Sequence, residues 1–330
     1  MSKHAHEIMD NISAFAIDKS KSYMNSAVDA VKLTEKLASQ QILDKTNNKA
    51  MELYFFEQLQ LNDAFSAMYF GKENGDFIMV LRNKNGFMSR FISNDEKNNR
   101  HVETIFYDKS FKLIKQNNVN RKYDPRERPW YKLAQKNKEL IWTDPYVFFT
   151  LKQPGITTAT PFYNKEGTLQ GVLGVDIEIS KLSQFIANLK ISKNSKVFII
   201  DKSLKIVTFP NLKTIQVDEE TLKTRLLKID EINDAVALKS YTGYLDQYNK
   251  NERKKESTFS FKLENKKYFA KFVPFEMNNL QWTIGMYVPE NDYLGTLQRN
   301  QNANIAWMLI IGIISLIISY VISQAIAKPI

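Results

Sequence analysis

The sequence predicts an α+β protein with a long N-terminal helix, two antiparallel-sheet modules and a C-terminal transmembrane helix. Apolar residues recur at helical spacing over residues 7–60, and the first 120 residues contain no proline. Short apolar and aromatic runs then alternate with turn sequences such as KENGD and KNG, the pattern of strands joined by hairpins. Residues 305–322 form an uncharged apolar run, which indicates a membrane span.

The N-terminal region, residues 1–60, is expected to be mostly one long amphipathic helix. Its apolar residues are Ile12, Phe15, Ile17, Ala27, Val28, Val31, Leu33 and Leu37. These positions form one stripe on a helix, and such a stripe packs against either a sheet or a partner helix. The stripe alone does not decide between the two.

The first module is expected to span residues 61–191. Its predicted strands are 64–71, 77–83, 86–93, 101–108, 155–164 and 169–179, which would give an antiparallel sheet of five or six strands. The segment PWYKLAQKNKE, residues 129–139, reads as a short helix. A second amphipathic helix covers residues 180–191, with Ser180 as its expected N-cap.

The second, smaller module is expected to span residues 192–290. Residues 196–210 read as a hairpin, residues 217–238 as a polar and partly helical stretch, and residues 257–275 and 280–289 as further strands. Both modules end in a strand, a turn and an apolar final strand. This shared order indicates a weak internal duplication.

The C-terminal region is expected to contain a connecting helix over 291–304 and a transmembrane helix over 305–326. Trp307 and Tyr320 lie near the ends of the apolar run, where interfacial anchors are common. A buried core helix is the alternative, but such helices are rarely apolar on all sides for five turns. The N-terminus shows no signal peptide, so an exported module would need a membrane helix before Met1.

Composition excludes several functional classes. The chain has no cysteine, which rules out disulfides and thiolate chemistry. The net charge is +10, but the lysines are spread along the chain and no nucleic-acid-binding motif is present. The HAHE sequence at residues 4–7 has metal-like spacing but no second ligand cluster, and no catalytic or phosphate-binding motif is found. We expect no enzyme activity, no cofactor and no metal.

The ordered set of motifs resembles the double Cache sensor domain of bacterial chemoreceptors and sensor kinases. The motifs are the long N-terminal helix, YDPRERPWY at 123–131, WTDPY at 142–146, ATPFYNKEGTLQGVLGVDI at 159–177, the hairpin VFIIDKSLKIVTFP, and the final AIAKPI. The resemblance covers about residues 10–300 and is strongest to Campylobacter-like chemotaxis receptors. It implies two PAS-like modules, membrane-distal and membrane-proximal, and a HAMP-like linker beginning at 327–330.

On composition alone, YDPRERPWY would be an exposed turn before a helix. The resemblance instead implies a ligand pocket, because amino-acid-binding double Cache domains share a motif that this chain matches at Tyr123, Arg128, Trp130, Tyr131, Tyr146 and Asp176. The Arg128 guanidinium would bind a carboxylate through its planar fork of donors. The aromatic residues would supply hydroxyl groups, an indole N–H and ring faces, while Asp176 would face a positive group.

One position departs from that motif. Phe148 stands where the amino-acid binders have an aspartate that resembles an ammonium anchor, and Phe149 follows it. The loss of one carboxylate weakens the case for an α-amino acid, and two phenylalanines make the pocket narrower and more apolar. Arg128 still favours a carboxylate. We therefore expect a short organic acid ahead of an amino acid.

The resemblance implies a chemoreceptor sensor domain in the bacterial inner membrane, with its ligand-binding part in the periplasm. The partners expected are the small ligand, a second copy of the chain, the membrane and a downstream signalling domain. That domain either continues beyond Ile330 or belongs to a separate polypeptide. A histidine kinase or cyclase sensor, and a membrane-anchored binding module without output, remain alternatives.

Overall fold

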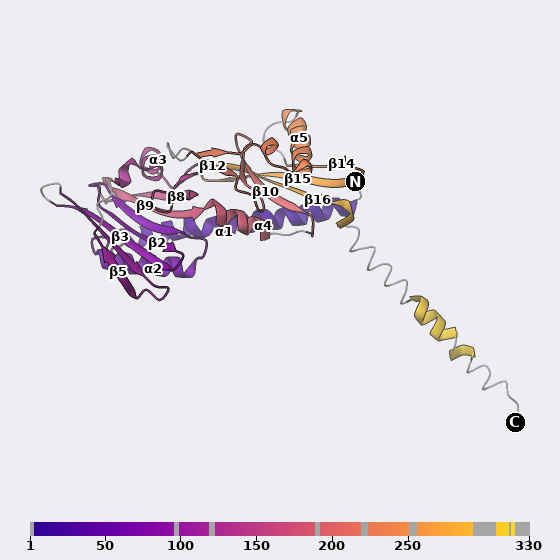
Figure 1. Ribbon diagram of the computed structural model, residues 1–330, viewed down its shortest axis with the longest axis horizontal. Helices are drawn as coiled ribbons and strands as arrows, with labels where there is room; N and C mark the ends of the chain where they lie inside the picture. The colour runs from indigo at the N-terminus through magenta and orange to yellow at the C-terminus, as the bar shows by residue number, and fades with distance from the viewer. Residues whose placement is uncertain are drawn as a thin grey trace, which may run out of the picture.

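The computed structural model shows two main sheets that lie end to end along the long axis of the molecule (Figure 1). The expected combination of an N-terminal helix with antiparallel sheets is confirmed. The structure describes residues 3–95, 99–118, 123–188, 192–218, 224–250, 256–292, 308–316 and 318–320.

The N-terminal region contains two helices where the sequence predicts mostly continuous helix. Helix α1 spans Lys3–Ser39 and helix α2 spans Asn48–Leu61. The first ends where Gln41 adopts a left-handed backbone with φ 60°, a common way to stop a helix. The Asn47 side chain then caps α2 by accepting two backbone N–H hydrogen bonds, so the second helix starts in a new direction.

The larger sheet has nine antiparallel strands in the order β5-β4-β3-β2-β1-β9-β8-β6, with β7 paired to β8. The sequence predicts most of them but not β5, β6 and β7, which are short or polar. The bounds are β1 Ala67–Lys72, β2 Phe77–Asn83, β3 Gly86–Asn94, β4 Arg100–Tyr107, β5 Leu113–Asn117, β6 Ile141–Trp142, β7 Tyr146–Val147, β8 Pro154–Tyr163 and β9 Leu169–Glu178.

Each face of this sheet is covered by a different set of helices. Helices α1, α2 and α4 (Ile179–Asn188) contact one face, and η1 (Pro125–Glu127) and α3 (Pro129–Asn137) contact the other. Alternate residues of each strand serve the two faces: Met68 joins the core on the α1 side, and Tyr69 joins the core beneath α3. Ser180 is not the N-cap of α4, because the helix already begins at Ile179.

The smaller sheet has five strands in the order β11-β10-β16-β15-β14, beside a two-stranded sheet of β12 and β13. Helix α5 packs on this sheet, and the sequence predicts only part of it because its outer face is polar. The bounds are β10 Lys196–Asp201, β11 Ile206–Thr208, β12 Ile215–Val217, β13 Thr224–Leu226, η2 Ile229–Glu231, α5 Ala235–Lys250, β14 Ser257–Leu263, β15 Lys266–Met277 and β16 Leu280–Pro289.

Two kinds of contact connect the two sheets. Helix α1 runs along both, contacting β8 and β9 of the larger sheet and β15 of the smaller one (Figure 1). On β15 the buried Lys271 ammonium pairs with Asp10 of α1 at 2.7 Å. In addition, the Asn279 side chain accepts a hydrogen bond from the Trp142 backbone N–H and donates one to the Trp142 carbonyl, both at 2.7 Å.

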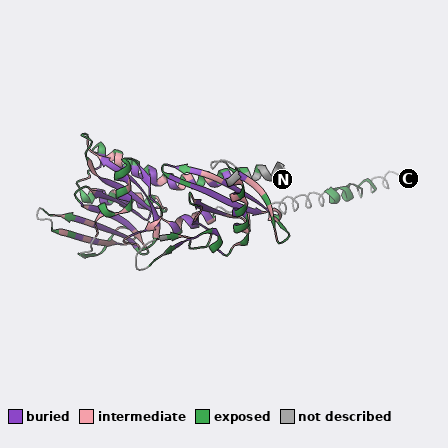
Figure 2. Ribbon diagram, turned by 90° about the horizontal axis from the view of Figure 1, so that it is seen from above, coloured by how far each residue is buried: buried purple, intermediate pink, exposed green. Residues whose placement is uncertain are grey.

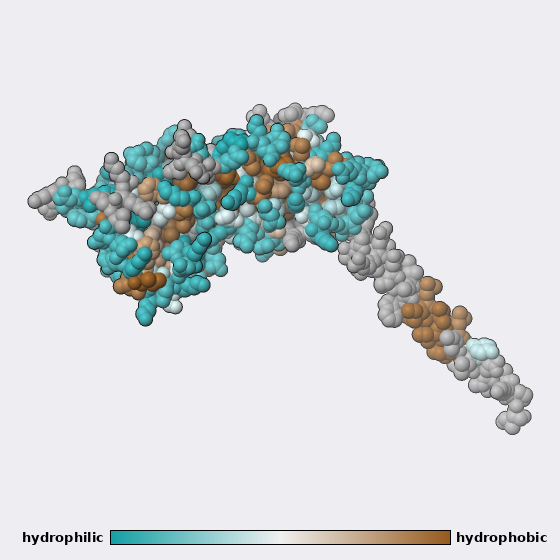
Figure 3. Space-filling view, in the orientation of Figure 1, coloured by the Kyte–Doolittle hydropathy of each residue, from teal (hydrophilic) through white to brown (hydrophobic). Residues whose placement is uncertain are grey.

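The C-terminal segment stands apart from the folded part of the chain. Residues 308–316 and 318–320 are helical and exposed, and their surface is strongly hydrophobic (Figures 2 and 3). In the part of the chain that the structure describes, no helix is both long and apolar enough to span a bilayer. The remainder of the predicted span 305–326, the predicted linker at 327–330 and most of the predicted helix 291–304 lie outside the described residues.

Candidate functional site

The segment 123–131 forms a short 3-10 helix followed at once by helix α3. Asp124 starts η1 by accepting a hydrogen bond from the Arg126 backbone N–H at 2.9 Å, and its carboxylate pairs with the Arg126 guanidinium at 2.8 Å. Pro129 occupies the first turn of α3, where its missing N–H has no cost. Between the two helices, Arg128 has an extended backbone. The outer charges are thus paired at the surface, and Arg128 reaches inward.

Beneath α3 lies a small cavity that collects most of the predicted site residues. It is lined by Tyr69, Met79, Leu81, Tyr123, Arg128, Trp130, Tyr146, Phe148, Phe149, Thr150, Leu151 and Asp176. Its volume is only about 20 Å³. Since a cavity of this size holds about one water molecule, the structure corresponds to a closed pocket.

Arg128 lies among three aromatic rings in this cavity. Its guanidinium carbon is 6.0 Å from the ring centre of Tyr123, 5.9 Å from that of Tyr146 and 5.7 Å from that of Phe149. The guanidinium makes one hydrogen bond within the described residues, a long one of 3.4 Å to the Val147 carbonyl. No ion pair between described residues includes Arg128. Its donors are therefore available to a carboxylate.

On the opposite wall, Asp176 is buried in a network of hydroxyl groups. Its Oδ1 accepts hydrogen bonds from Tyr69 at 2.5 Å and from Thr157 at 2.6 Å, and the Thr157 and Tyr146 hydroxyls lie 2.7 Å apart. Burial raises the pKa of Asp176 to about 7, although these hydrogen bonds and the charge of Arg128 oppose the rise. The carboxyl group thus takes up a proton at a much higher pH than an exposed aspartate does.

Phe148 fills the space that a longer ligand would need. Its side chain is 3% exposed, and its ring packs edge-on against Tyr146 with ring centres 5.3 Å apart. It also lies directly over Gly155 of β8, where a Cβ atom would be only 2.0 Å from the ring. Phe148 thus lines a small cavity, and its ring can take this position because residue 155 is a glycine.

The structure gathers six of the seven predicted site residues around the cavity, and Tyr131 is the exception. The Tyr131 ring packs against Trp130 within the same core, and its buried hydroxyl has no hydrogen-bond partner among the described residues. Sequence reasoning missed Tyr69 and Thr157. Each lies on a strand that pairs with β9, so register brings both to Asp176. Their polar side chains within apolar strands were the available signal.

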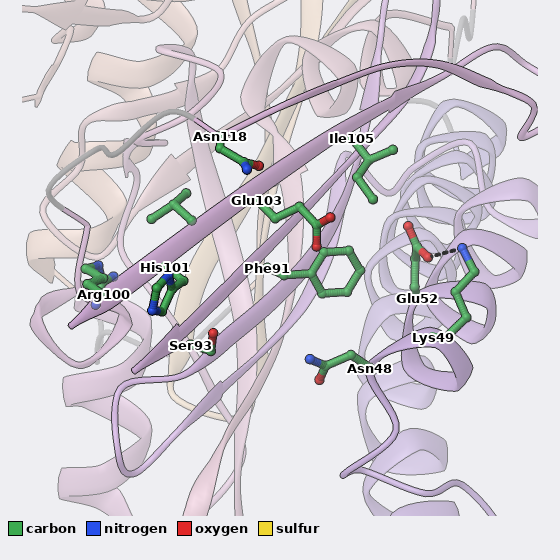
Figure 4. A pocket seen from close by; sticks show the side chains of 11 residues that line it. Asn48, Lys49, Glu52, Phe91, Ser93, Arg100, His101, Glu103, Ile105 and Asn118 are labelled. Carbon is green, nitrogen blue, oxygen red and sulfur yellow. Dashed lines mark hydrogen bonds and ion pairs between the residues drawn. The ribbon is translucent and has the colours of Figure 1, made fainter. Parts of the chain in front are cut away.

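A wider groove of about 550 Å³ lies between the start of α2 and strands β3 and β4 (Figure 4). Its charges are of both signs, and two buried nitrogens of the Arg100 guanidinium have no hydrogen-bond partner among the described residues. The acidic groups, by contrast, are satisfied. Glu52 pairs with Lys49 at 2.6 Å and accepts a hydrogen bond from the Tyr107 hydroxyl at 2.7 Å, and Glu103 accepts one from Gln116. The cavity beneath α3 is the stronger candidate, because there the guanidinium lies together with the aromatic residues and the carboxyl group of the predicted motif.

Comparison with known proteins identifies the family of the chain. The dCache_1 family model, described as Cache domain, matches residues 1–297. The chemotaxis protein McpB of Bacillus subtilis is 26% identical over 181 residues, which is 54% of this chain and 22% of McpB. Adenylate cyclase 1 of Rhizobium meliloti is 20% identical over 223 residues, 67% of this chain and 30% of the cyclase. The chain thus spans under a third of either relative.

Solved structures with the same fold are ligand-binding domains of chemoreceptors. That of Campylobacter jejuni Tlp3 with 4-methylisoleucine has a TM-score of 0.52 and 17% identity, covering 88% of this chain and 94% of that one. That of Pseudomonas fluorescens CtaA with L-alanine has a TM-score of 0.51 and 17% identity, covering 86% and 96%. That of Pseudomonas aeruginosa PctC with GABA has a TM-score of 0.50 and 18% identity, covering 84% and 98%.

Proposed function

Because the chain belongs to the Cache domain family, we propose that it is the extracytoplasmic sensory domain of a membrane-bound chemoreceptor. In this proposal a small carboxylate binds in the cavity beneath α3, and binding is reported across the membrane in chemotaxis. The family shares its fold among many ligands, so the ligand class has to be argued from the site. The observation that carries the proposal is the uncommitted guanidinium of Arg128 within a ring of aromatic side chains.

A carboxylate satisfies this site better than a neutral ligand does. A guanidinium held by one long hydrogen bond has donors left for a planar, two-pronged partner. The proposed binding residues are those expected from the sequence, Tyr123, Arg128, Trp130, Tyr131, Tyr146, Phe148 and Asp176, although Tyr131 does not line the cavity. We propose Tyr69 and Thr157 beside them, because both donate hydrogen bonds to Asp176. Each of the molecules named with the similar structures, 4-methylisoleucine, L-alanine and GABA, carries a carboxylate.

The opposite wall favours a short organic acid over an amino acid. An ammonium group needs a charged, accessible partner when it is buried. Asp176 has a pKa near 7, and its Oδ1 already accepts two hydroxyl hydrogen bonds. Phe148 stands where a second acid would help and is apolar. A ligand with a carboxylate and no ammonium needs neither a charged Asp176 nor an acid in place of Phe148. An amino acid is the second choice.

Binding of any such ligand requires the pocket to open. A three-carbon acid is several times larger than the water molecule for which 20 Å³ suffices. The segment 146–151 supplies five of the lining residues and pairs with β8 only through the two-residue strand β7. We propose that this segment moves to admit the ligand. A ligand that binds the open state shifts the population towards it.

For signal transfer we propose the organisation expected from the sequence. Residues 61–191 form the membrane-distal module and residues 192–290 the membrane-proximal one, with a connecting helix at 291–304, a membrane span at 305–326 and a HAMP-like linker from 327. The exposed apolar helix at 308–316 supports the span. Dimerisation through residues 1–60 is supported by exposed apolar side chains on α1, Phe15 and Leu33.

A second candidate function uses the same pocket with a different output. The similarity to Adenylate cyclase 1 favours a sensor that controls a cyclase or a kinase instead of chemotaxis. A membrane-anchored binding module without output is the remaining alternative. In each of these proposals the chain itself binds a ligand and catalyses no reaction.

The test is a binding screen on the full chain by thermal shift and calorimetry. The ligands are formate, acetate, lactate, pyruvate, succinate and fumarate beside the common amino acids. We expect an organic acid to raise the melting temperature of the parent but not of Arg128→Ala, because only the folded state binds. Arg126→Ala is the matched control, since Arg126 is exposed and paired with Asp124. Binding of amino acids alone would refute the organic-acid preference, and binding that survives Arg128→Ala would refute the site.

A further inference from the structure

Another cleft, much larger than the cavity beneath α3, lies where the two sheets meet. Helix α4, the turn at 152–154 and the segment 211–215 form its walls, and its volume is about 670 Å³. None of its lining residues also lines the cavity beneath α3. Small-molecule sites commonly measure 300–1,000 Å³ and often lie between modules. The cleft is thus large enough for a ligand without any rearrangement, unlike the first pocket.

The chemistry of the cleft selects an anion that also carries hydroxyl groups. Its described walls contain two lysines, Lys152 and Lys213, and no aspartate or glutamate. Hydroxyl and amide side chains surround them, among them Ser183, Gln184 and Asn211. Such groups both donate and accept hydrogen bonds, so they suit a polyhydroxylated ligand, whereas a simple anion needs donors only.

The charges of the two lysines are not neutralised by the protein. Neither takes part in an ion pair between described residues. The Lys152 ammonium lies 4.7 Å from the ring centre of Phe149, a weak contact for a cation at the surface. The net charge of +10 adds a field that attracts anions to a concave site.

An apolar strip lies beside these polar groups. Ile179, Leu212 and Ile215 line the cleft together with the lysines. A sugar ring has one face of C–H groups and an edge of hydroxyl groups, so it can cover an apolar strip while its hydroxyls bind amide groups. The combination of lysines, neutral polar groups and this strip therefore fits a sugar derivative with one acidic group.

We propose that this cleft is a second ligand site, which binds a sugar acid or a sugar phosphate. The site is separate from the carboxylate pocket, but the two are adjacent along the chain at residues 148–152. The backbone runs directly from Phe148 and Phe149 of the pocket to Lys152 of the cleft, and the Lys152 N–H donates a hydrogen bond to the Phe148 carbonyl at 2.9 Å. An anion that draws Lys152 into the cleft therefore acts on the segment that closes the first pocket.

The test measures binding of glucuronate, glucose 6-phosphate and glucose to the full chain by calorimetry. We expect at least one of the two anions to bind and glucose to bind roughly tenfold more weakly, which is the effect of about one charge-assisted contact. The Lys152→Glu/Lys213→Glu double variant should weaken the anion by at least about tenfold. The Lys165→Glu/Lys239→Glu variant makes the same change in net charge at exposed lysines outside the cleft, and it should bind like the parent.

Arg128→Ala distinguishes the two sites, because it removes the carboxylate partner of the first pocket only. Anion binding that persists in this variant and fails in the Lys152→Glu/Lys213→Glu variant supports the cleft. Failure of both anions to bind the parent overturns the proposal, as does equal binding by glucose. Binding that is lost in Arg128→Ala also overturns it, because the anion would then occupy the first pocket. Ala187→Trp, which fills the cleft from α4, should block binding without any change of charge.

Discussion

The buried carboxyl group of Asp176 makes the stability of the protein depend on pH in a direction opposite to that of most acidic residues. Its pKa rises from 3.8 in the unfolded chain to about 7 in the folded protein. Between these values the folded state holds a proton that the unfolded state has released. The contribution of this group is therefore complete below about pH 4 and declines until the pH exceeds about 7.

The size of this effect follows from the pKa difference. About three pKa units at about 1.4 kcal/mol each correspond to roughly 4 kcal/mol. Asp176→Asn replaces the neutral form by a group of the same shape, whose carbonyl can still accept hydrogen bonds from Tyr69 and Thr157. The variant should lose this component of the pH dependence and gain on the parent as the pH rises from 5 to 8.

The assay is thermal melting of the parent and Asp176→Asn at several values between pH 5 and pH 8. About two of the three pKa units fall between pH 5 and pH 8, so the expected gain is roughly 3 kcal/mol. For a protein of this size that corresponds to roughly 5–10 °C in melting temperature. The quantity compared is how the difference in melting temperature between the variant and the parent changes with pH. A cost of the asparagine that is the same at every pH cancels in this comparison. If the two proteins showed the same pH dependence, a raised pKa for Asp176 would be refuted.

Three further changes test the pocket and its connection to the second sheet. Phe148→Asp should raise the affinity for alanine relative to lactate by about tenfold, measured as a ratio by calorimetry; an unchanged ratio would show that Phe148 does not set specificity. Gly155→Ala should lower the free energy of unfolding by roughly 1–3 kcal/mol, because the added Cβ meets the Phe148 ring, and a smaller loss is expected in a Phe148→Ala background. Asn279→Ala removes two hydrogen bonds to the Trp142 backbone and should cost about 1–3 kcal/mol in a melting experiment. The exposed neighbour Gln281→Ala should cost little, and equal losses would argue against the link.

Sequence patterns predicted those parts of the fold that local residues determine. The strands at 77–83 and 280–289 coincide with β2 and β16, because apolar runs there are bounded by turn residues. The break between α1 and α2 was missed because residues 40–47 contain neither glycine nor proline. A positive φ at Gln41 ends the helix instead, and no composition rule anticipates a left-handed glutamine.

The candidate site likewise has one part that a sequence motif indicates and one part that only the folded sheet brings together. Arg128 and its aromatic neighbours come from one continuous segment, so a motif could indicate them together. Tyr69 and Thr157 approach Asp176 only through the pairing of β1 and β8 with β9. Strand register is a property of the assembled sheet, and a single sequence does not reveal it. The near-closure of the pocket was also out of reach, because it depends on how Phe148 packs over Gly155.

Helix α1 also forms a stiff connection between the two sheets. Its 37 residues give a rod about 55 Å long. Near one end Asp10 pairs with Lys271 of β15, and farther along the helix packs against β8 and β9. A rod of that length turns by only about 1° when one end moves by about 1 Å. If opening of the proposed pocket shifts β8 or β9, the rod can carry that shift to β15 without a large deformation. The stiffness of α1, more than the size of the initial movement, would then determine how much of a ligand-induced movement reaches the second sheet.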